Sequence, residues 1–222
     1  MKESAPALVI VDMQNYYLRA DSPYSRYFDS FKAGCLDYIR NRCNSTVVPN
    51  IRLLLKHFRE SSLPVVYLRL CGTKPDRSDL HPFFAETYRK ALLAGFDGIY
   101  PLAKEPMASV IEEIAPIHGE TVIDKTTFSA FTATDMDAHL RGLGVSELVF
   151  TGLATSQCVE TTARDASERG YRVIHIEDAQ ADYDEMIHSY SLIASQGVCG
   201  GFITTAVNYS TGGISTGTRE IG

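Results

Sequence analysis

Three residues able to do acid–base or nucleophilic chemistry each follow a short apolar run. Asp12 closes ALVIVD, Lys125 closes TVIDK, and Cys158 follows ELVFTGLATSQ. Runs rich in Val and Ile are typical of strands that are covered on both faces of a parallel sheet. Ligands of such open sheets bind beyond the carboxyl ends of the strands. We therefore expect the carboxylate, the ammonium and the thiol to meet at one edge, as in a hydrolase with a cysteine nucleophile.

Each of these residues has a role in such chemistry and also a simpler interpretation. Cys158 is expected in the first turn of a helix capped by Thr155 or Ser156, where the helix dipole lowers a thiol pKa and free N–H groups bind an oxyanion. Asp12 would move the thiol proton, and Lys125 would stabilise negative charge and orient the carboxylate. Taken singly, they are a small buried residue, a turn former and a surface lysine. The hypothesis therefore depends on all three meeting.

Short apolar runs alternate with helix-periodic segments, which predicts a doubly wound sheet. Strands are expected at 7–12, 63–70, 120–124, 147–152, 171–177 and 201–207. Helices are expected at 46–61, near 107–115, and at 134–143, 157–169 and 182–196. The predicted fold class is α/β, a three-layer, mostly parallel, Rossmann-like sheet in a single domain, 1–207. The tail 208–222, rich in Gly, Ser and Thr, is expected to be flexible or to contact a neighbouring subunit.

Two connections, 16–45 and 71–106, are longer than ordinary links between strands and helices and are candidate lids. The first is rich in aromatic residues, which either line a substrate pocket or pack the connection onto the body of the domain. Tyr16, nearest to Asp12, is the best candidate for a pocket residue. Arg69 and Lys74, near the end of the second strand, are candidates for binding a substrate carboxylate.

Composition excludes several classes of function. The net charge of −6 and the absence of a basic cluster argue against nucleic acid as a partner. Five cysteines form an odd set without CxxC spacing, which argues against a disulfide framework and favours a reducing cytoplasm. Cys35, Cys43, Cys71 and Cys199 are interpreted as structural. No segment is long and apolar enough for a secretory signal or a membrane span, so a soluble protein is expected.

Three motifs extend this interpretation. DMQN at 12–15, K-x-x-x-SAF at 125–131 and G-x-AT-x-x-CV at 152–159 together resemble the isochorismatase-like cysteine hydrolases, which include nicotinamidase and the N-carbamoylsarcosine, ureidoacrylate and biuret hydrolases. The resemblance spans about residues 7–205 and implies an isochorismatase-type fold with Asp12, Lys125 and Cys158 as the catalytic triad. It also implies an oxyanion hole formed by the backbone N–H groups of Ala154 and Cys158, a cis peptide within 153–155, and a homodimer or homotetramer.

Departures from the relatives narrow the expected chemistry. In the family that this chain resembles, the nicotinamidase branch consists of metal enzymes with an Asp-x-His pair after the second strand. This chain reads CGTKPDRSDLHPF there and lacks such a pair. Asp76, Asp79 and His81 are spaced as in a solvated loop, so neither a metal nor another cofactor is expected. The retained cysteine favours amide cleavage over hydrolysis of the isochorismate vinyl ether. SQGVCGG at 195–201 resembles a segment of the biuret and N-carbamoyl branch, which makes Gln196 a candidate to bind a carbamoyl group.

The sequence thus predicts a metal-independent amidohydrolase with a small-molecule substrate, a ureido or N-carbamoyl compound being the favoured class. Cleavage would pass through a thioester on Cys158. The alternatives are an isochorismatase-type vinyl ether hydrolase, a nicotinamidase-like amidase, and a catalytically silent binding protein or thiol redox sensor.

Overall fold

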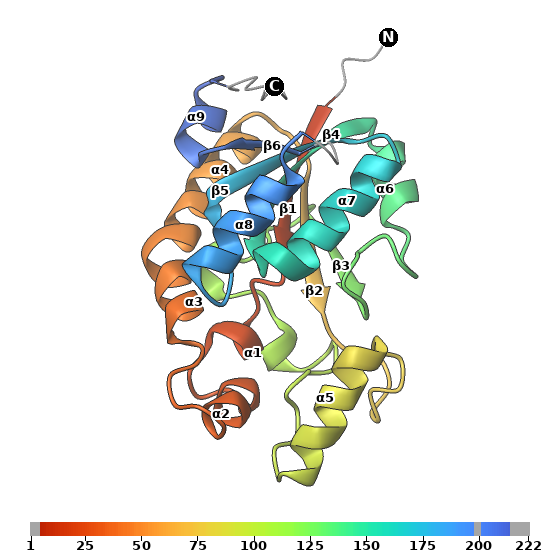
Figure 1. The fold of residues 1–222 in the computed structure, drawn as a ribbon. Helices are drawn as coiled ribbons and strands as arrows, with labels where there is room; N and C mark the ends of the chain where they lie inside the picture. Colours follow the sequence, from red (N-terminus) through yellow and green to blue (C-terminus); the bar gives the residue numbers. More distant parts are fainter. Residues whose placement is uncertain (1–4, 198–200, 214–222) are drawn as a thin grey trace.

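A single parallel sheet organises the chain in the computed structural model, which describes residues 5–197 and 201–213. Its six strands follow the order β3-β2-β1-β4-β5-β6, and every neighbouring pair is parallel (Figure 1). The strands are β1 (Ala5–Val11), β2 (Val65–Leu70), β3 (Thr121–Lys125), β4 (Val145–Leu153), β5 (Arg172–Ala181) and β6 (Gly201–Thr204). The strand order reverses between β1 and β4, as in a doubly wound α/β fold. The predicted fold class is confirmed.

Two apolar cores, one on each face of the sheet, result from the alternation of side chains along the strands. In β1, Leu8 and Ile10 join the core beneath α4 (Val48–Glu60), whereas Val9 and Val11 join the core beneath α6 (Met136–Gly142) and α7 (Glu160–Glu168). Two further helices, α8 (Glu185–Ser195) and α9 (Ala206–Ser210), pack against α7 and α4 respectively. These layers bury both faces of the central strands, as their continuous apolar runs predicted.

Gly152 sets the approach of β4 to β1. It lies opposite Val11 in the register, with φ +101°, and a Cβ at this position would lie 2.1 Å from the Val11 carbonyl oxygen. Only glycine combines this backbone conformation with so close a contact. The glycine of the third motif therefore holds the ends of β1 and β4, the strands that precede Asp12 and Cys158, directly against each other.

Both long connections contain helices that the sequence did not predict. The first contains α1 (Asn15–Leu18), α2 (Pro23–Asp29), α3 (Asp37–Arg42) and a π-helical turn (Cys43–Val47), and the second contains α5 (Pro82–Leu93). Figure 1 shows α1, α2 and α5 gathered beyond one end of the sheet, the end at which β1 leads into α1. The predicted pocket side of the sheet is thus covered by short helices.

The helix expected near 107–115 is not present, which corrects that prediction. Two 3₁₀ turns, Pro106–Ala108 and Glu112–Ile114, take its place. Residues between them are extended because their backbone bonds the segment after β1, with the Ile111 N–H donating to the Met13 carbonyl and Val110 bridging Gln14. Tertiary pairing has overridden the local helical pattern.

The predicted domain boundary at residue 207 falls inside α9, and most of the predicted tail, 214–222, lies outside the described residues. Within the ranges 5–197 and 201–213, none of the helices has the length and apolar character that a membrane crossing requires.

Candidate active site

Asp12 lies at the turn that follows β1 and is almost fully buried, with 2% of its surface exposed. Its φ of +52° is in the left-handed region, which Asp and Asn adopt more readily than other non-glycine residues. The Gln14 amide supports this turn, since it accepts from the Leu70 N–H at 2.8 Å and donates to the carbonyls of Leu70 (3.2 Å) and Ala108 (2.9 Å). The DMQN motif therefore ties the end of β1 to the end of β2.

Lys125 is the last residue of β3 and is fully buried. Its ammonium donates to Asp12 Oδ2 at 2.9 Å, to the Thr127 carbonyl at 3.1 Å and to Cys158 Sγ at 3.2 Å. Since β2 lies between β3 and β1, the long lysine side chain is what brings the ammonium to the aspartate. The structure thus brings together the three residues that the sequence singled out.

The SAF motif fastens the segment after Lys125 to the helix that follows Cys158. Ser129 Oγ donates to Asp165 Oδ2 at 2.7 Å, and the Ala130 N–H donates to Thr162 Oγ1 at 3.3 Å. Thr162 in turn donates to the Cys158 carbonyl at 2.6 Å. The second and third motifs therefore act as one hydrogen-bonded unit around the thiol.

Cys158 lies in a π-helical turn, Thr155–Val159, that leads into α7. The expected side-chain cap from Thr155 or Ser156 is not formed, because Asp182, which follows β5, takes this role from outside the helix. Asp182 accepts from the Ser156 N–H at 2.6 Å through Oδ2 and from the Tyr183 N–H at 2.8 Å through Oδ1. Thr155 instead bonds the His188 ring. The turn that carries the thiol is thus held by two residues from the β5–α8 region.

The Cys158 thiol is not acidified as the helix position predicted. Burial raises its pKa, the negative charge of Asp12 raises it further, and Lys125 only partly opposes them. For Lys125, burial acts to lower the pKa, but the charge of Asp12 and the contacts with Asp12 and Cys158 outweigh it and leave the pKa raised. Both directions favour a protonated thiol beside an ammonium. Asp12 Oδ1 is buried and has no hydrogen-bond partner among the described residues, so this oxygen is free to receive the thiol proton.

The peptide bonds around Ala154 are trans, which corrects the expected cis peptide. Among the described residues no peptide bond is cis. The chain reverses here through the positive φ of Gly152 and then the π-helical turn, a path that trans bonds accommodate. Ala154 and Cys158 both line the cavity described next.

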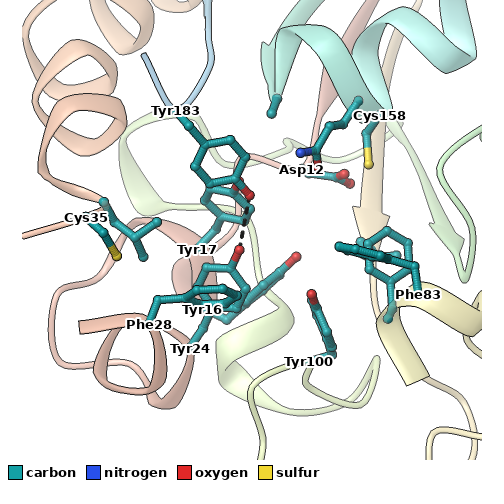
Figure 2. A pocket seen from close by; sticks show the side chains of 15 residues that line it. Asp12, Tyr16, Tyr17, Tyr24, Phe28, Cys35, Phe83, Tyr100, Cys158 and Tyr183 are labelled. Atoms are coloured by element: carbon teal, nitrogen blue, oxygen red, sulfur yellow. Dashed lines mark hydrogen bonds between the residues drawn. The ribbon is translucent and has the colours of Figure 1, made fainter. Parts of the chain in front are cut away.

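A cavity of about 360 Å³ opens in front of Asp12 and Cys158. The first long connection contributes four aromatic residues to its wall: Tyr16, Tyr17, Tyr24 and Phe28. The second contributes Phe83, Phe84 and Tyr100. Figure 2 shows Tyr17, Tyr24 and Tyr183 on one side of the space before Cys158 and Phe83 on the other. Aromatic residues of the first connection thus both line the pocket and pack onto the body, and Tyr16 lies where the sequence predicted.

The isochorismatase domain family matches residues 6–207. The chain belongs to the isochorismatase family. This confirms the resemblance that the three motifs indicated, and the match covers all the strands that position Asp12, Lys125 and Cys158.

Individual relatives of this isochorismatase-family chain act on amides. Ureidoacrylate amidohydrolase RutB of Stutzerimonas stutzeri is 31% identical over 195 residues, covering 81% of this chain and 71% of that protein. Nicotinamidase 3 of Arabidopsis thaliana is 26% identical over 189 residues, covering 84% of this chain and 78% of that protein. The chain is accordingly a hydrolase of the isochorismatase family, and these named relatives hydrolyse carbon–nitrogen bonds other than peptide bonds.

Solved structures of the same family share the fold. An isochorismatase family protein from Desulfovibrio vulgaris superposes with a TM-score of 0.76 at 25% identity, covering 94% of this chain and 98% of that one. N-carbamoylsarcosine amidase from Thermoplasma acidophilum gives a TM-score of 0.64 at 29% identity, with coverages of 91% and 96%.

Three predicted substrate contacts lie outside the cavity. Arg69 points to the opposite face of β2 from the pocket residue Leu70 and pairs with Asp124 on β3 at 2.7 and 2.9 Å. Lys74 belongs to an exposed turn whose backbone bonds Asp79 and Arg77. Gln196 follows α8, which runs antiparallel to the strands, so it lies beside the start of β6 at the far edge of the sheet. Their positions near a strand end or a motif were predicted from the sequence, but the face of β2 that Arg69 occupies and the edge of the sheet at which Gln196 lies were not.

The rival acidic cluster in the second connection is held by local hydrogen bonds. Asp79 accepts from the backbone and hydroxyl of Thr73, Asp76 accepts from the Ser78 N–H, and His81 caps α5. Within the described part of the chain, no three His, Cys, Asp or Glu side chains are grouped as metal ligands.

Several residues of the site were not predicted from the sequence. Asp182 and Tyr183 follow β5 at the same edge as Asp12, so the strand-end argument would have found them had it been applied to that strand. Phe83, Phe84 and Tyr100 carry no such signal, because only the folding of α5 and its loop over the sheet brings them to the cavity.

His188 links the turn that carries Cys158 to Arg42 of α3. Its burial predicts that the protein becomes less stable in acid. Arg42 can only donate, so it bonds His188 Nε2 (3.0 Å) as an acceptor, and Nδ1–H then donates to Thr155 Oγ1 at 2.8 Å. Burial lowers the pKa of His188 to about 4, and also that of His175 to about 4. The folded protein therefore binds fewer protons than the unfolded chain between pH 6.5 and 4. The contribution of these histidines to the free energy of unfolding is therefore greatest above pH 6.5 and is lost as the pH falls toward 4.

Urea unfolding at pH 7.5 and pH 5 tests this. We expect a loss of about 2 kcal/mol per buried histidine between these two pH values. His188→Gln should lose about half of this pH dependence, whereas His118→Gln, on the surface, should retain all of it. Equal free energies of unfolding at both pH values would contradict the assignment.

Proposed function

We propose that the chain cleaves a small amide through a thioester on Cys158, with Asp12, Lys125 and Cys158 as the catalytic triad and ureido or N-carbamoyl compounds as the first candidates. One observation carries the proposal: the buried Lys125 ammonium bonds both the Asp12 carboxylate (2.9 Å) and the Cys158 thiol (3.2 Å) at the edge of a cavity. A nucleophile, a base and a cation in contact are the groups that covalent amide hydrolysis requires.

In the first half of the reaction, Asp12 Oδ1 takes the thiol proton as Cys158 Sγ attacks the substrate carbonyl carbon. The carbonyl oxygen becomes an oxyanion, which the backbone N–H groups of Ala154 and Cys158 would bind while Lys125 compensates the added charge. Collapse of this intermediate breaks the C–N bond. The departing ammonia or amine carries away the proton held by Asp12, leaving an acyl thioester and an ionised carboxylate.

In the second half, Asp12 takes a proton from water as the water oxygen attacks the thioester carbonyl. The intermediate expels the Cys158 sulfur, which regains its proton from Asp12, and the acid product leaves. Burial raises the pKa of the thiol, which favours transfer of its proton to Asp12 as the sulfur attacks. Each step uses only groups of the chain, substrate and water.

A nicotinamidase-like amidase is the second candidate, and the aromatic wall favours it because a planar ring packs well against such a surface. Hydrolysis of isochorismate ranks lower. That substrate carries two carboxylates, and Asp12 is the only charged side chain among the described residues that line the cavity.

The thioester provides the direct test. We expect intact-protein mass spectrometry of enzyme quenched during turnover of a ureido compound, another N-carbamoyl compound or a primary amide to show an acyl adduct on Cys158. The Cys35→Ala protein, which lacks the other cysteine of the cavity wall, should form the same adduct. Turnover with an adduct on Cys35, or with no adduct under any quench condition, would refute the proposed intermediate.

A further inference from the structure

The cavity before Cys158 presents many aromatic faces but no cation to a bound molecule. Its wall consists of aromatic residues, Leu36, Leu70, Ala154, Cys35 and Gln157, together with Asp12 and Cys158. We propose that the substrate is an amide or N-carbamoyl compound whose non-reacting part is uncharged, apolar and about the size of one aromatic ring. This inference rests on the proposed function and specifies its substrate.

Two cations that bond residues of the site, Lys125 and Arg77, already have partners. The ammonium of Lys125 donates its three hydrogen bonds to Asp12, Thr127 and Cys158. Arg77, beside the second connection, donates to the backbone carbonyls of Tyr100 (2.7 Å) and Pro75 (2.7 Å), and its side chain is 4% exposed. A substrate carboxylate would therefore be buried without a counter-charge, which is strongly unfavourable.

The negative charge of Asp12 in the cavity wall also disfavours an anionic substrate. Burial raises the pKa of Tyr16, and the negative charge of Asp12 raises it further. An anionic substrate body would meet the same repulsion.

The tyrosine hydroxyls do not convert the wall into a polar surface. Tyr17 donates to the Tyr183 hydroxyl at 2.6 Å, and the Tyr24 hydroxyl lies 3.3 Å from that same oxygen. The rings of Tyr17 and Tyr24 stack at a centroid distance of 5.0 Å. These three residues satisfy one another and leave ring surface for the ligand. The Tyr16 hydroxyl is buried without a partner among the described residues, which leaves one position for a neutral polar atom.

The volume sets the size of the substrate. At about 360 Å³ the cavity is close to the lower end of the range for ligand pockets, roughly 300–1,000 Å³. Such a space is large enough for a reacting amide group and a single ring. Ureidoacrylate, named in the RutB relatives, carries a carboxylate and lacks a ring, so we expect this chain to differ from those relatives in specificity.

Matched compounds that differ by one carboxylate test the inference: benzamide against 4-carboxybenzamide, and phenylurea against 4-ureidobenzoate. Calorimetric binding to the Cys158→Ala protein measures recognition, and ammonia release by the wild-type protein measures chemistry. We expect the neutral member of each pair to bind about 100-fold more tightly or better. Equal or tighter binding of the carboxylates would overturn the inference. Preferential binding of the neutral compounds without ammonia release from any amide would uphold the inference and refute the proposed function.

A positive charge introduced into the cavity wall provides a second test of the inference. Phe83 lines the cavity and is 55% exposed, so it tolerates a polar replacement. Phe83→Arg should shift the preference toward 4-carboxybenzamide by about 10-fold through a new ion pair, whereas Phe83→Leu should not shift it. An unchanged preference in Phe83→Arg, or an equal shift in Phe83→Leu, would show that charge does not decide recognition and would overturn the inference.

Discussion

Replacing Cys158 with alanine is expected to lower kcat for every hydrolysed amide by a factor of about 10⁴ or more, since loss of a covalent nucleophile costs this much in comparable enzymes. Cys158→Ser should be almost as inactive, because a hydroxyl beside the same carboxylate is a much weaker nucleophile. The assay is steady-state release of ammonia or amine by purified protein.

Folding and specificity controls accompany this measurement. The Cys158 side chain is small and packs at the cavity edge, so circular dichroism and the urea midpoint should change little. Cys35→Ala removes a thiol from the same wall and should retain most activity. Near-normal turnover by Cys158→Ala would eliminate the thioester pathway.

Replacing Lys125 with methionine is expected to damage both activity and stability. The side chain is fully buried, and its removal leaves the Asp12 carboxylate, 2% exposed, without its only charged partner among the described residues. Breaking a buried ion pair on one side costs about 3–5 kcal/mol. The loss of charge compensation at the transition state should lower kcat by about 10³-fold. Urea unfolding at pH 7.5 and steady-state kinetics measure the two effects.

A second variant separates these effects. In Asp12→Asn with Lys125→Met, the stranded charge is gone, so most of the lost stability should return while activity stays absent. Full recovery of activity would show that the ion pair has no part in the chemistry. A Lys125→Met protein as stable as wild type would show that the pair is not desolvated as its burial indicates.

The sequence predicted that Asp12, Lys125 and Cys158 would meet because this prediction depends on a rule with few exceptions. Parallel strands deliver their carboxyl ends to one edge, so Asp12 and Lys125 could be placed together although 113 positions separate them. Apolar runs and helical periodicity predicted the six strands and the helices α4, α6, α7 and α8.

The pocket wall could not be predicted in this way, because it depends on how short helices pack. Tyr100 and Phe84 reach the cavity through the path of the second connection, which no periodicity encodes. Arg69 was misplaced because proximity to a strand end does not say which face a side chain occupies, and Gln196 because the helix before it ends at the opposite edge of the sheet. The thiol pKa was predicted to fall because burial, which a sequence does not report, was left out.

Lys125 closes β3, which is the outermost strand of the sheet and pairs only with β2. Edge strands open locally at a lower free energy than the whole domain unfolds. Such an opening would withdraw the ammonium while β1 and β4 stay paired. We therefore expect the β3 amides to exchange with solvent faster than those of the central strands β1 and β4, and amide hydrogen exchange measures this difference.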